Sequence, residues 1–120
     1  IIRLFWFFMD KVAITDFDKL DLRVGEIMEV EDHPNASKLI IMKVDFGSEI
    51  GERTIVAGLK GFYSPDELVG KKAIFVVNLE PVVLRGIESN GMILAASNSD
   101  KISVKVLMVD GDLEKGSKVS

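Results

Sequence analysis

Cysteine is missing from this 120-residue chain, and histidine occurs once, at position 33. Without cysteine the chain can form neither a disulfide framework nor a thiolate zinc site, and it has no cysteine nucleophile. One histidine also leaves no ready Ser-His-Asp arrangement, because His33 is the only imidazole base available. We therefore expect no catalytic residue, no metal site and no cofactor. The lack of cysteine also fits a reducing, cytoplasmic location.

Long apolar runs are lacking as well. The stretch 1–8, IIRLFWFF, contains Arg3 and is far shorter than the roughly 20 apolar residues that cross a bilayer. No small-residue cleavage site follows it, so it does not read as a signal peptide, and no membrane partner is expected. Composition changes sharply at Met9. We expect residues 1–13 to be either an arm that packs on a partner subunit or an artefact of a wrong start or foreign addition, with one domain at 14–120.

Basic side chains are fewer than acidic ones. The chain has 15 Lys and Arg against 19 Asp and Glu, which gives a formal net charge of −4. A nucleic-acid-binding protein of this composition has to gather its cations on one face. Its carboxylates are spread through turns and strand ends, as is typical of solvated surface charge. With 48% hydrophobic residues, the chain can still bury the core of one ordinary domain.

What the sequence does contain is a series of short segments rich in β-branched residues and separated by turn residues, which is typical of strands. The first of them is expected to bend or bulge at Gly25, since glycine resists a bend least. His33-Pro34-Asn35 and Asn90-Gly91 are expected turns. In chain order the expected strands are 22–30, 39–44, 53–57, 73–78, 92–96 and 104–109.

Two short helices are also predicted. Thr15-Asp16-Phe17-Asp18 is expected to start one, with Thr15 as its cap. The second begins at Ser64-Pro65-Asp66-Glu67, where Ser caps, Pro takes the first position and Glu67 completes a capping box. A short helix between the third and fourth of five strands is the order of an OB-fold. We therefore predict an all-β protein: a five-stranded OB-fold barrel with a C-terminal β extension.

Some basic and polar residues occur where such a barrel presents its usual binding face, on the second and third strands and the loop joining the fourth to the fifth. The cations are Lys38, Lys43, Arg53 and Arg85. Scattered, solvated cations explain the same residues equally well. The stretch 78–92, NLEPVVLRGIESNGM, offers further amide and hydroxyl groups that could bond base edges. A well-turned connecting loop, with Asn78 bonding its own backbone, is the alternative.

Five phrases in one order resemble a known family. They are Asp21-Leu22-Arg23-Val24-Gly25, His33-Pro34-Asn35-Ala36-Ser37-Lys38-Leu39, Arg53-Thr54-Ile55-Val56-Ala57-Gly58-Leu59, Asn78-Leu79-Glu80-Pro81 and Gly86-Ile87-Glu88-Ser89-Asn90-Gly91-Met92. Together they are similar to the tRNA-binding domain at the C-terminus of many methionyl-tRNA synthetases, which also occurs as stand-alone tRNA-binding proteins and in multisynthetase accessory factors. The similarity runs from about Phe17 to Ser97, and more loosely to the end.

The resemblance implies an OB-fold that binds tRNA with little sequence preference and is not itself an enzyme. Such a module assists aminoacylation, as a synthetase β subunit, C-terminal domain or stand-alone protein, by raising the local tRNA concentration. The implied partners are tRNA, a second copy of the chain in a homodimer, and the methionyl-tRNA synthetase catalytic subunit. Carried over by position, the tRNA contacts are Lys38, Arg53, Asn78, Arg85, Ser89 and Met92.

The chain departs from the family pattern at a few positions. Ala57 stands where the family often has Ser, and Val82 and Val83 stand where a basic residue usually follows Pro81. Losing a cation there should weaken phosphate binding. The alternative interpretation is an export-chaperone-like protein of the same fold that binds unfolded polypeptide. The His-Pro-Asn-Ala and Ser-Asn-Gly-Met phrases favour the synthetase-associated branch, because the chaperone-like branch tends to lack both.

Overall fold

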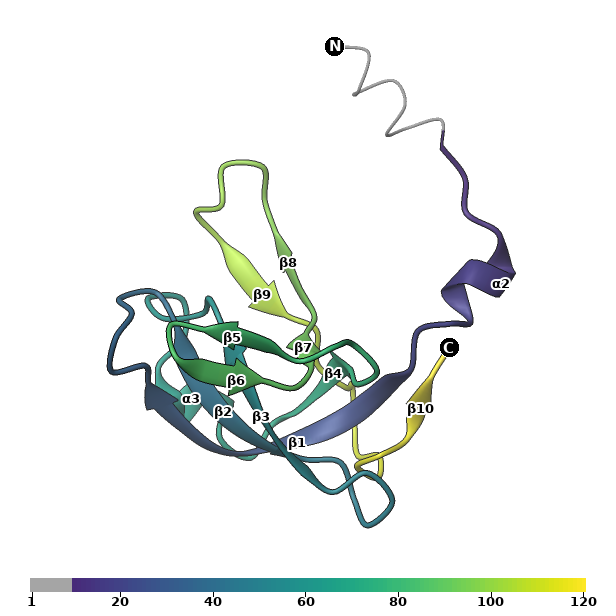
Figure 1. Cartoon of the computed structure of the whole chain (residues 1–120), viewed down its shortest axis with the longest axis horizontal. Coiled ribbons are helices and arrows are strands. Elements are labelled where there is room, and N and C mark those ends of the chain that lie inside the picture. The colour runs from purple at the N-terminus through teal and green to yellow at the C-terminus, as the bar shows by residue number, and fades with distance from the viewer. Residues whose placement is uncertain (1–9) are drawn as a thin grey trace.

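The computed structural model describes residues 10–120, so residues 1–9 of the predicted N-terminal arm lie outside the described part. A curled antiparallel sheet dominates it (Figure 1). The sheet order is β3-β2-β1-β4-β7, and β10 pairs with the start of β1. These strands are β1 (Leu22–Asp32), β2 (Ile40–Asp45), β3 (Glu52–Ala57), β4 (Lys72–Val76), β7 (Met92–Ile93) and β10 (Lys118–Val119). The predicted all-β, OB-like architecture is confirmed.

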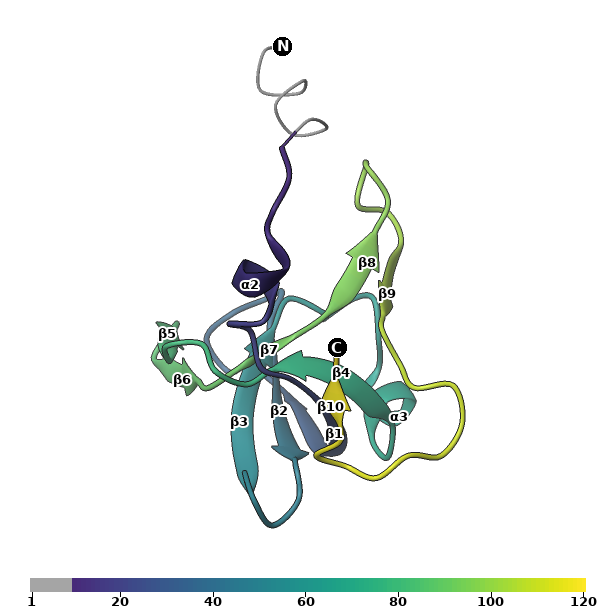
Figure 2. The same ribbon diagram turned by 90° about the vertical axis from the view of Figure 1, so that its right-hand side faces the viewer.

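Two hairpins stand outside this sheet. One consists of β5 (Val82–Leu84) and β6 (Ile87–Ser89), and the other of β8 (Ala95–Ser97) and β9 (Val104–Val106). Figure 2 shows the β8–β9 hairpin projecting from the body on one side and the β5–β6 hairpin lying on another. The helices are short: α2 (Ile14–Phe17) and α3 (Pro65–Leu68). Within residues 10–120 no helix has the length and apolar character needed to cross a bilayer.

The core lies inside the curled sheet. Ile27, Met42, Ile55 and Phe75 are among its fully buried side chains, and they come from β1, β2, β3 and β4. Phe46 meets Phe75 edge to face, with ring centroids 5.3 Å apart, a favoured arrangement of two aromatic quadrupoles. Each of the four strands thus contributes fully buried side chains to one common core.

The helix between β3 and β4 is confirmed, together with its predicted start. The Glu67 carboxylate accepts hydrogen bonds from the Ser64 N–H at 2.8 Å and the Ser64 hydroxyl at 3.2 Å. Both bonds stabilise the charged carboxylate and lower the pKa of Glu67. Leu68 is the residue that this helix buries. The capping box therefore fixes the turn that delivers Leu68 to the core.

The predicted bend at Gly25 is wrong. Gly25 sits in a regular ladder opposite Ala73, and the register of β1 against β2 shifts further on, between Ile27 and Glu29. A methyl group on Gly25 would come within 2.6 Å of both Val44 and Phe46. Glycine is needed there because the core packs directly against the backbone, and the bulge falls at Met28 instead.

Smaller predictions also need correction. Thr15 does not cap α2, because the helix already begins at Ile14 and Ala13 takes the cap position without a side-chain hydrogen bond. The strand expected over 92–96 divides into β7 and β8, and β9 ends at Val106 rather than 109. The stretch 78–92 is more ordered than the loop expected there, because it contains the β5–β6 hairpin.

Candidate nucleic-acid interface

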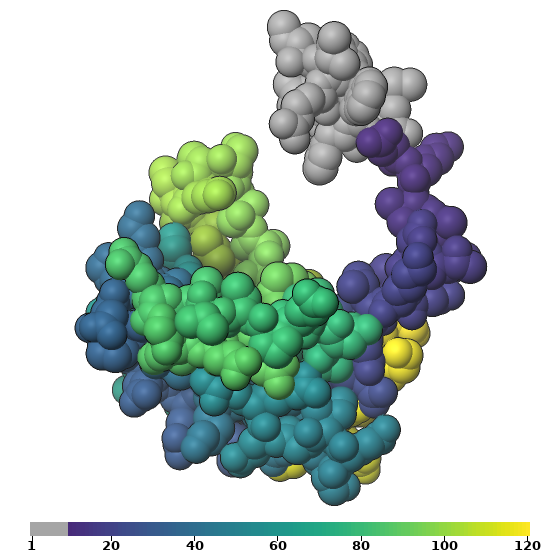
Figure 3. Space-filling model, viewed as in Figure 1, coloured from purple at the N-terminus to yellow at the C-terminus, as the bar shows by residue number. Residues whose placement is uncertain are grey.

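The β5–β6 hairpin packs beside β3 and lies in front of the sheet in the view of Figures 1 and 3. Its two strands pair through a turn formed by Arg85 and Gly86, whose φ angles are +52° and +90°. A two-residue hairpin turn with both φ angles positive matches the twist of the flanking strands. This conformation is unusual for arginine. It places Arg85, which is exposed, at the tip of the hairpin.

The β1–β2 loop, residues 33–39, meets that tip. His33 is 3% exposed, and its Nε2 lies 3.0 Å from the carbonyl oxygen of Leu84. Lys38 is exposed on the same loop. We call residues 33–39 and 82–89 together the loop–hairpin end. This end brings Lys38 and Arg85, which are far apart in the sequence, onto two segments that are hydrogen-bonded to each other.

Hydrogen bonds between residues 89–90 and β3 close the barrel, and we call this contact the seam. The N–H of Val56 donates to the Ser89 hydroxyl at 3.0 Å, and the N–H of Asn90 donates to the carbonyl of Thr54 at 2.8 Å. The Ser89 hydroxyl in turn donates to the carbonyl of Gly91 at 3.2 Å. Ser89 is 2% exposed. The structure thus places this predicted contact residue in the seam, where its hydroxyl joins two strands and faces no solvent.

The other three predicted tRNA contacts, Arg53, Asn78 and Met92, lie outside the loop–hairpin end. Arg53 is half-buried, and its guanidinium donates to the carbonyl of Val77. Asn78 is exposed, but its side-chain oxygen accepts from the N–H of Asp21 at 2.7 Å and its amide donates to the carbonyl of Lys19 at 2.7 Å. Asn78 therefore ties the segment before β1 to the end of β4. Met92 is 46% exposed and borders an apolar hollow beside β8.

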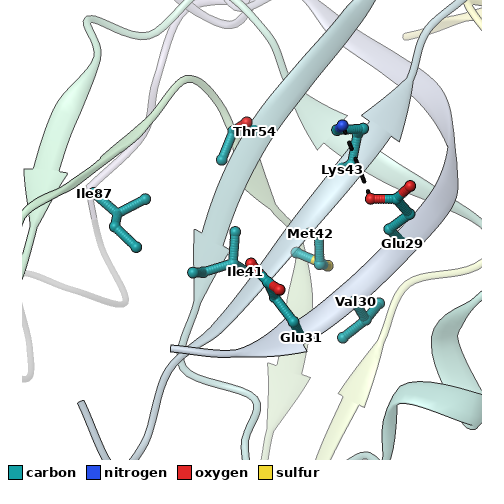
Figure 4. A pocket seen from close by; sticks show the side chains of 8 residues that line it. All are labelled: Glu29, Val30, Glu31, Ile41, Met42, Lys43, Thr54 and Ile87. Atoms are coloured by element: carbon teal, nitrogen blue, oxygen red, sulfur yellow. Dashed lines mark ion pairs between the residues drawn. The ribbon is translucent and has the colours of Figure 1, made fainter. Parts of the chain in front are cut away.

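A groove of about 430 Å³ lies between the hairpin and the outer side of β1, β2 and β3 (Figure 4). Ile87 of the hairpin forms one wall, and Glu29 and Glu31 reach in from β1. Lys43 of β2 pairs with Glu29, with 3.8 Å between Nζ and Oε2. The groove therefore carries more carboxylate than cation. Phosphates are disfavoured in it, although the fold alone would make this the expected binding face.

Ion pairs decide which cations are available to a polyanion. Within residues 10–120, some lysines and arginines have no carboxylate in ion-pair distance: Lys11, Lys38, Arg53, Lys71, Arg85, Lys101 and Lys105. Lys38 and Arg85 are the two of these on the loop–hairpin end. Neither has a carboxylate to release before it contacts a phosphate. The same described residues contain no cluster of three or more potential metal-ligating side chains.

Sequence reasoning missed the position of His33. It identified a turn histidine, and the turn is present: the N–H of Asn35 donates to Nδ1 of His33 at 3.0 Å. The bond to Leu84, 51 positions away, had no local signal.

These features describe a small OB-like barrel with exposed, unpaired cations at one end, a class of module that binds nucleic acids. Residues 22–118 match the model of the family described as "Putative tRNA binding domain". The chain belongs to this family of tRNA-binding domains, and the resemblance seen in the sequence is confirmed. The domain is a tRNA-binding module related to methionine–tRNA ligase.

Individual relatives agree with this assignment. The methionine–tRNA ligase of Pyrococcus horikoshii is 55% identical over 111 residues, which cover 92% of this chain and 15% of that protein. A methionyl-tRNA-synthetase-related protein from the same organism has a solved structure with a TM-score of 0.87 and 38% identity, covering 93% of this chain and 100% of the other. The CsaA chaperone protein of Picrophilus torridus also superimposes, with a TM-score of 0.83 and 38% identity, covering 92% and 100%.

Proposed function

We propose that the domain contacts tRNA mainly through the loop–hairpin end, with Lys38 and Arg85 on phosphates and little sequence preference. The observation that carries this proposal is the pair of exposed cations without ion-pair partners on two joined segments. Phosphate contacts fix orientation without reading bases, so such a surface accepts many tRNAs. The acidic groove beside it supports contact at the tip rather than across the outer sheet face.

The other predicted residues take secondary roles in this proposal. Arg53 is proposed as a further cation, and Met92 as an apolar contact for an unstacked base. Asn78 and Ser89 act indirectly, since their polar groups are already bonded within the domain. We expect Ser89 to support tRNA binding through the seam that it closes.

We further propose that the domain assists aminoacylation in the cytoplasm. The chain spans about 15% of the length of the methionine–tRNA ligase that it matches. A module of this size serves a synthetase by holding tRNA near the catalytic part, which raises the effective tRNA concentration. The methionyl-tRNA synthetase catalytic subunit is therefore the partner that we expect, whether joined covalently or bound.

We also propose that the domain acts as a homodimer. Exposed apolar side chains gather on the N-terminal segment, where Val12 is 74% and Ile14 70% exposed, and at the β8–β9 hairpin, where Ile102 is 76% exposed. Burying such side chains against a second copy is favourable. Two copies would also double the number of unpaired cations. Sedimentation at micromolar concentration tests this, and a 13 kDa species would contradict it.

Fluorescence anisotropy with unfractionated tRNA at rising salt tests the tRNA proposal. We expect affinity to fall log-linearly with salt, because each neutralised phosphate releases counterions. An unfolded polypeptide serves as competitor and should not displace the tRNA. The opposite result, polypeptide bound and tRNA ignored at low salt, would favour a chaperone function. The solved CsaA structure and the exposed Val82 and Val83 of the hairpin are the observations that would then explain it.

A further inference from the structure

The hairpin that bears Arg85 has little other polar attachment at its tip. Strands β5 and β6 pair with each other and form a separate two-stranded sheet. The seam bonds start at Ser89, at the far end of β6. Within the described chain, the bond between His33 and the Leu84 carbonyl is the one hydrogen bond that joins residues 82–88 to another segment. An isolated two-stranded hairpin is marginally stable in water, so this bond has a large share in placing the tip.

The two bonds of His33 define its protonation. The N–H of Asn35 is a donor, so Nδ1 must accept and carry no proton. The Leu84 carbonyl is an acceptor, so Nε2 must carry the proton and donate. A neutral imidazole with its proton on Nε2 satisfies both partners at 3.0 Å. The ring is nearly fully buried, so losing either bond would leave a desolvated polar group without a partner.

The imidazole also connects the two segments that carry the cations. The Leu84 carbonyl directly precedes Arg85, and Lys38 follows His33 on the same loop. The backbone N–H of His33 donates to the carbonyl of Leu39 at 3.1 Å, which closes the loop around Lys38. One side chain therefore connects the loop carrying Lys38 with the turn carrying Arg85.

We propose that His33 is a positioning residue for tRNA binding: its neutral imidazole joins the β1–β2 loop to the hairpin tip and holds Lys38 and Arg85 in a fixed spacing for phosphates. This inference rests on the proposed function. His33 itself touches no RNA, because its side chain is buried where the two segments meet. Pre-set spacing matters because ordering a loose hairpin on binding would reduce affinity.

Two substitutions separate the two bonds of His33. His33→Asn keeps an acceptor near the position of Nδ1 for the Asn35 N–H but does not reach Leu84. His33→Gln places an amide donor near the position of Nε2, within reach of Leu84, and gives up the turn bond. We expect His33→Asn to weaken tRNA binding about three- to tenfold, the range of one charged contact. We expect His33→Gln to retain most of the affinity. Urea unfolding of both variants checks that each is folded.

A double-mutant cycle with Arg85→Asn tests whether His33 acts through the tip. In the Arg85→Asn background, His33→Asn should change affinity less than twofold, because the positioned cation is already gone. An equal loss in both backgrounds would overturn the proposal. If His33→Gln is as weak as His33→Asn, the bond to Leu84 is not the cause, and the proposal also fails.

Nitrogen NMR provides a measurement that needs no variant. The chain has one histidine, so imidazole signals come from His33 alone. We expect the signature of a neutral ring protonated at Nε2, in the free domain and with tRNA bound. Rapid averaging between tautomers would overturn the proposal. Absence of tRNA binding by the wild type would overturn the proposed function and this inference with it. A binding wild type with an unchanged His33→Asn variant would overturn this inference alone.

Discussion

The loop–hairpin end is joined by hydrogen bonds between uncharged groups, whereas the C-terminal segment, residues 107–120, is attached with ion pairs as well as backbone bonds. Lys115 contacts Asp45 at 2.8 Å and Glu26 at 3.5 Å, and Lys72 contacts Asp112 at 3.1 Å. At the other end His33 and Ser89 make the ties, and the cations stay unpaired. The difference shows how an acidic chain can keep cations for a polyanion: its carboxylates neutralise lysines where the tail is anchored.

The largest expected effect is on the C-terminal side. A methyl group on Gly116, where φ is +88°, would clash with the backbone carbonyl of Phe46. We expect Gly116→Ala to lower the free energy of unfolding by about 2–4 kcal/mol, from positive-φ strain plus the clash. Gly111→Ala is the matched control, since φ is +106° there with open space around it, and about 1 kcal/mol is expected. Urea titration measures both, and equal losses would contradict the tight tail packing.

The next effect belongs to the loop–hairpin end. Arg85→Asn removes the cation while keeping a residue that tolerates positive φ. We expect tRNA affinity to fall by about 1 kcal/mol or more, and the slope of log affinity against log salt to decrease by roughly one. Lys72→Gln removes an ion-paired cation from the C-terminal side and should leave that slope unchanged. If the slope changed only in the Lys72→Gln variant, the C-terminal side rather than the loop–hairpin end would be the surface that contacts phosphates.

Adding a positive charge to the loop–hairpin end should strengthen tRNA binding more than adding one elsewhere. Val83 is 64% exposed on the hairpin, so Val83→Lys adds a cation there at little cost in burial. We expect tRNA binding to tighten about two- to fivefold, with a steeper salt slope. Ile102→Lys makes the same change of charge at the β8–β9 hairpin, where Ile102 is 76% exposed. If both variants gain equally, net charge rather than the loop–hairpin end governs affinity.

The smallest effect is a pH dependence at the ion pair that anchors the tail. The pKa of Asp45 is lowered first by its bond to Lys115 and then by the Gly47 N–H. A lowered carboxyl pKa contributes stability that is present above the unfolded value and lost as pH falls through the folded value. Unfolding experiments below about pH 4 should show this loss in the wild type. Asp45→Asn should reduce the dependence, and an unchanged profile would mean that the pair with Lys115 does not anchor the tail.

Much of the barrel could be predicted from local patterns. The strands that match β1 to β4 are rich in β-branched residues. The start of α3 is predicted by the capping sequence Ser64-Pro65-Asp66-Glu67. The β5–β6 hairpin escaped prediction because Arg85 occupies a positive-φ position that Asn or Asp usually fills. The bulge at Met28 was also missed, because no glycine or proline marks that position in the sequence.

Only those residues of the candidate site whose role requires nothing more than solvent exposure could be predicted from the sequence. Lys38 and Arg85 are both exposed, but Lys38, expected on the second strand, lies in the loop before it. Ser89 is buried because it follows Glu88 in a strand, where successive side chains point to opposite faces. The contact between His33 and Leu84 joins two segments that are distant in sequence, and periodicity carries no information about such pairs.

The pairing of Leu22 with Val119 brings the entry and exit of the barrel side by side. A unit whose two ends leave from one edge can be spliced into a surface loop of another protein without stretching either partner. It can also be circularly permuted, by linking those ends and opening the chain at exposed turn residues such as Ser48 and Glu49. The pairing of β1 with β10 thus makes this barrel suited to insertion into another protein as a complete unit.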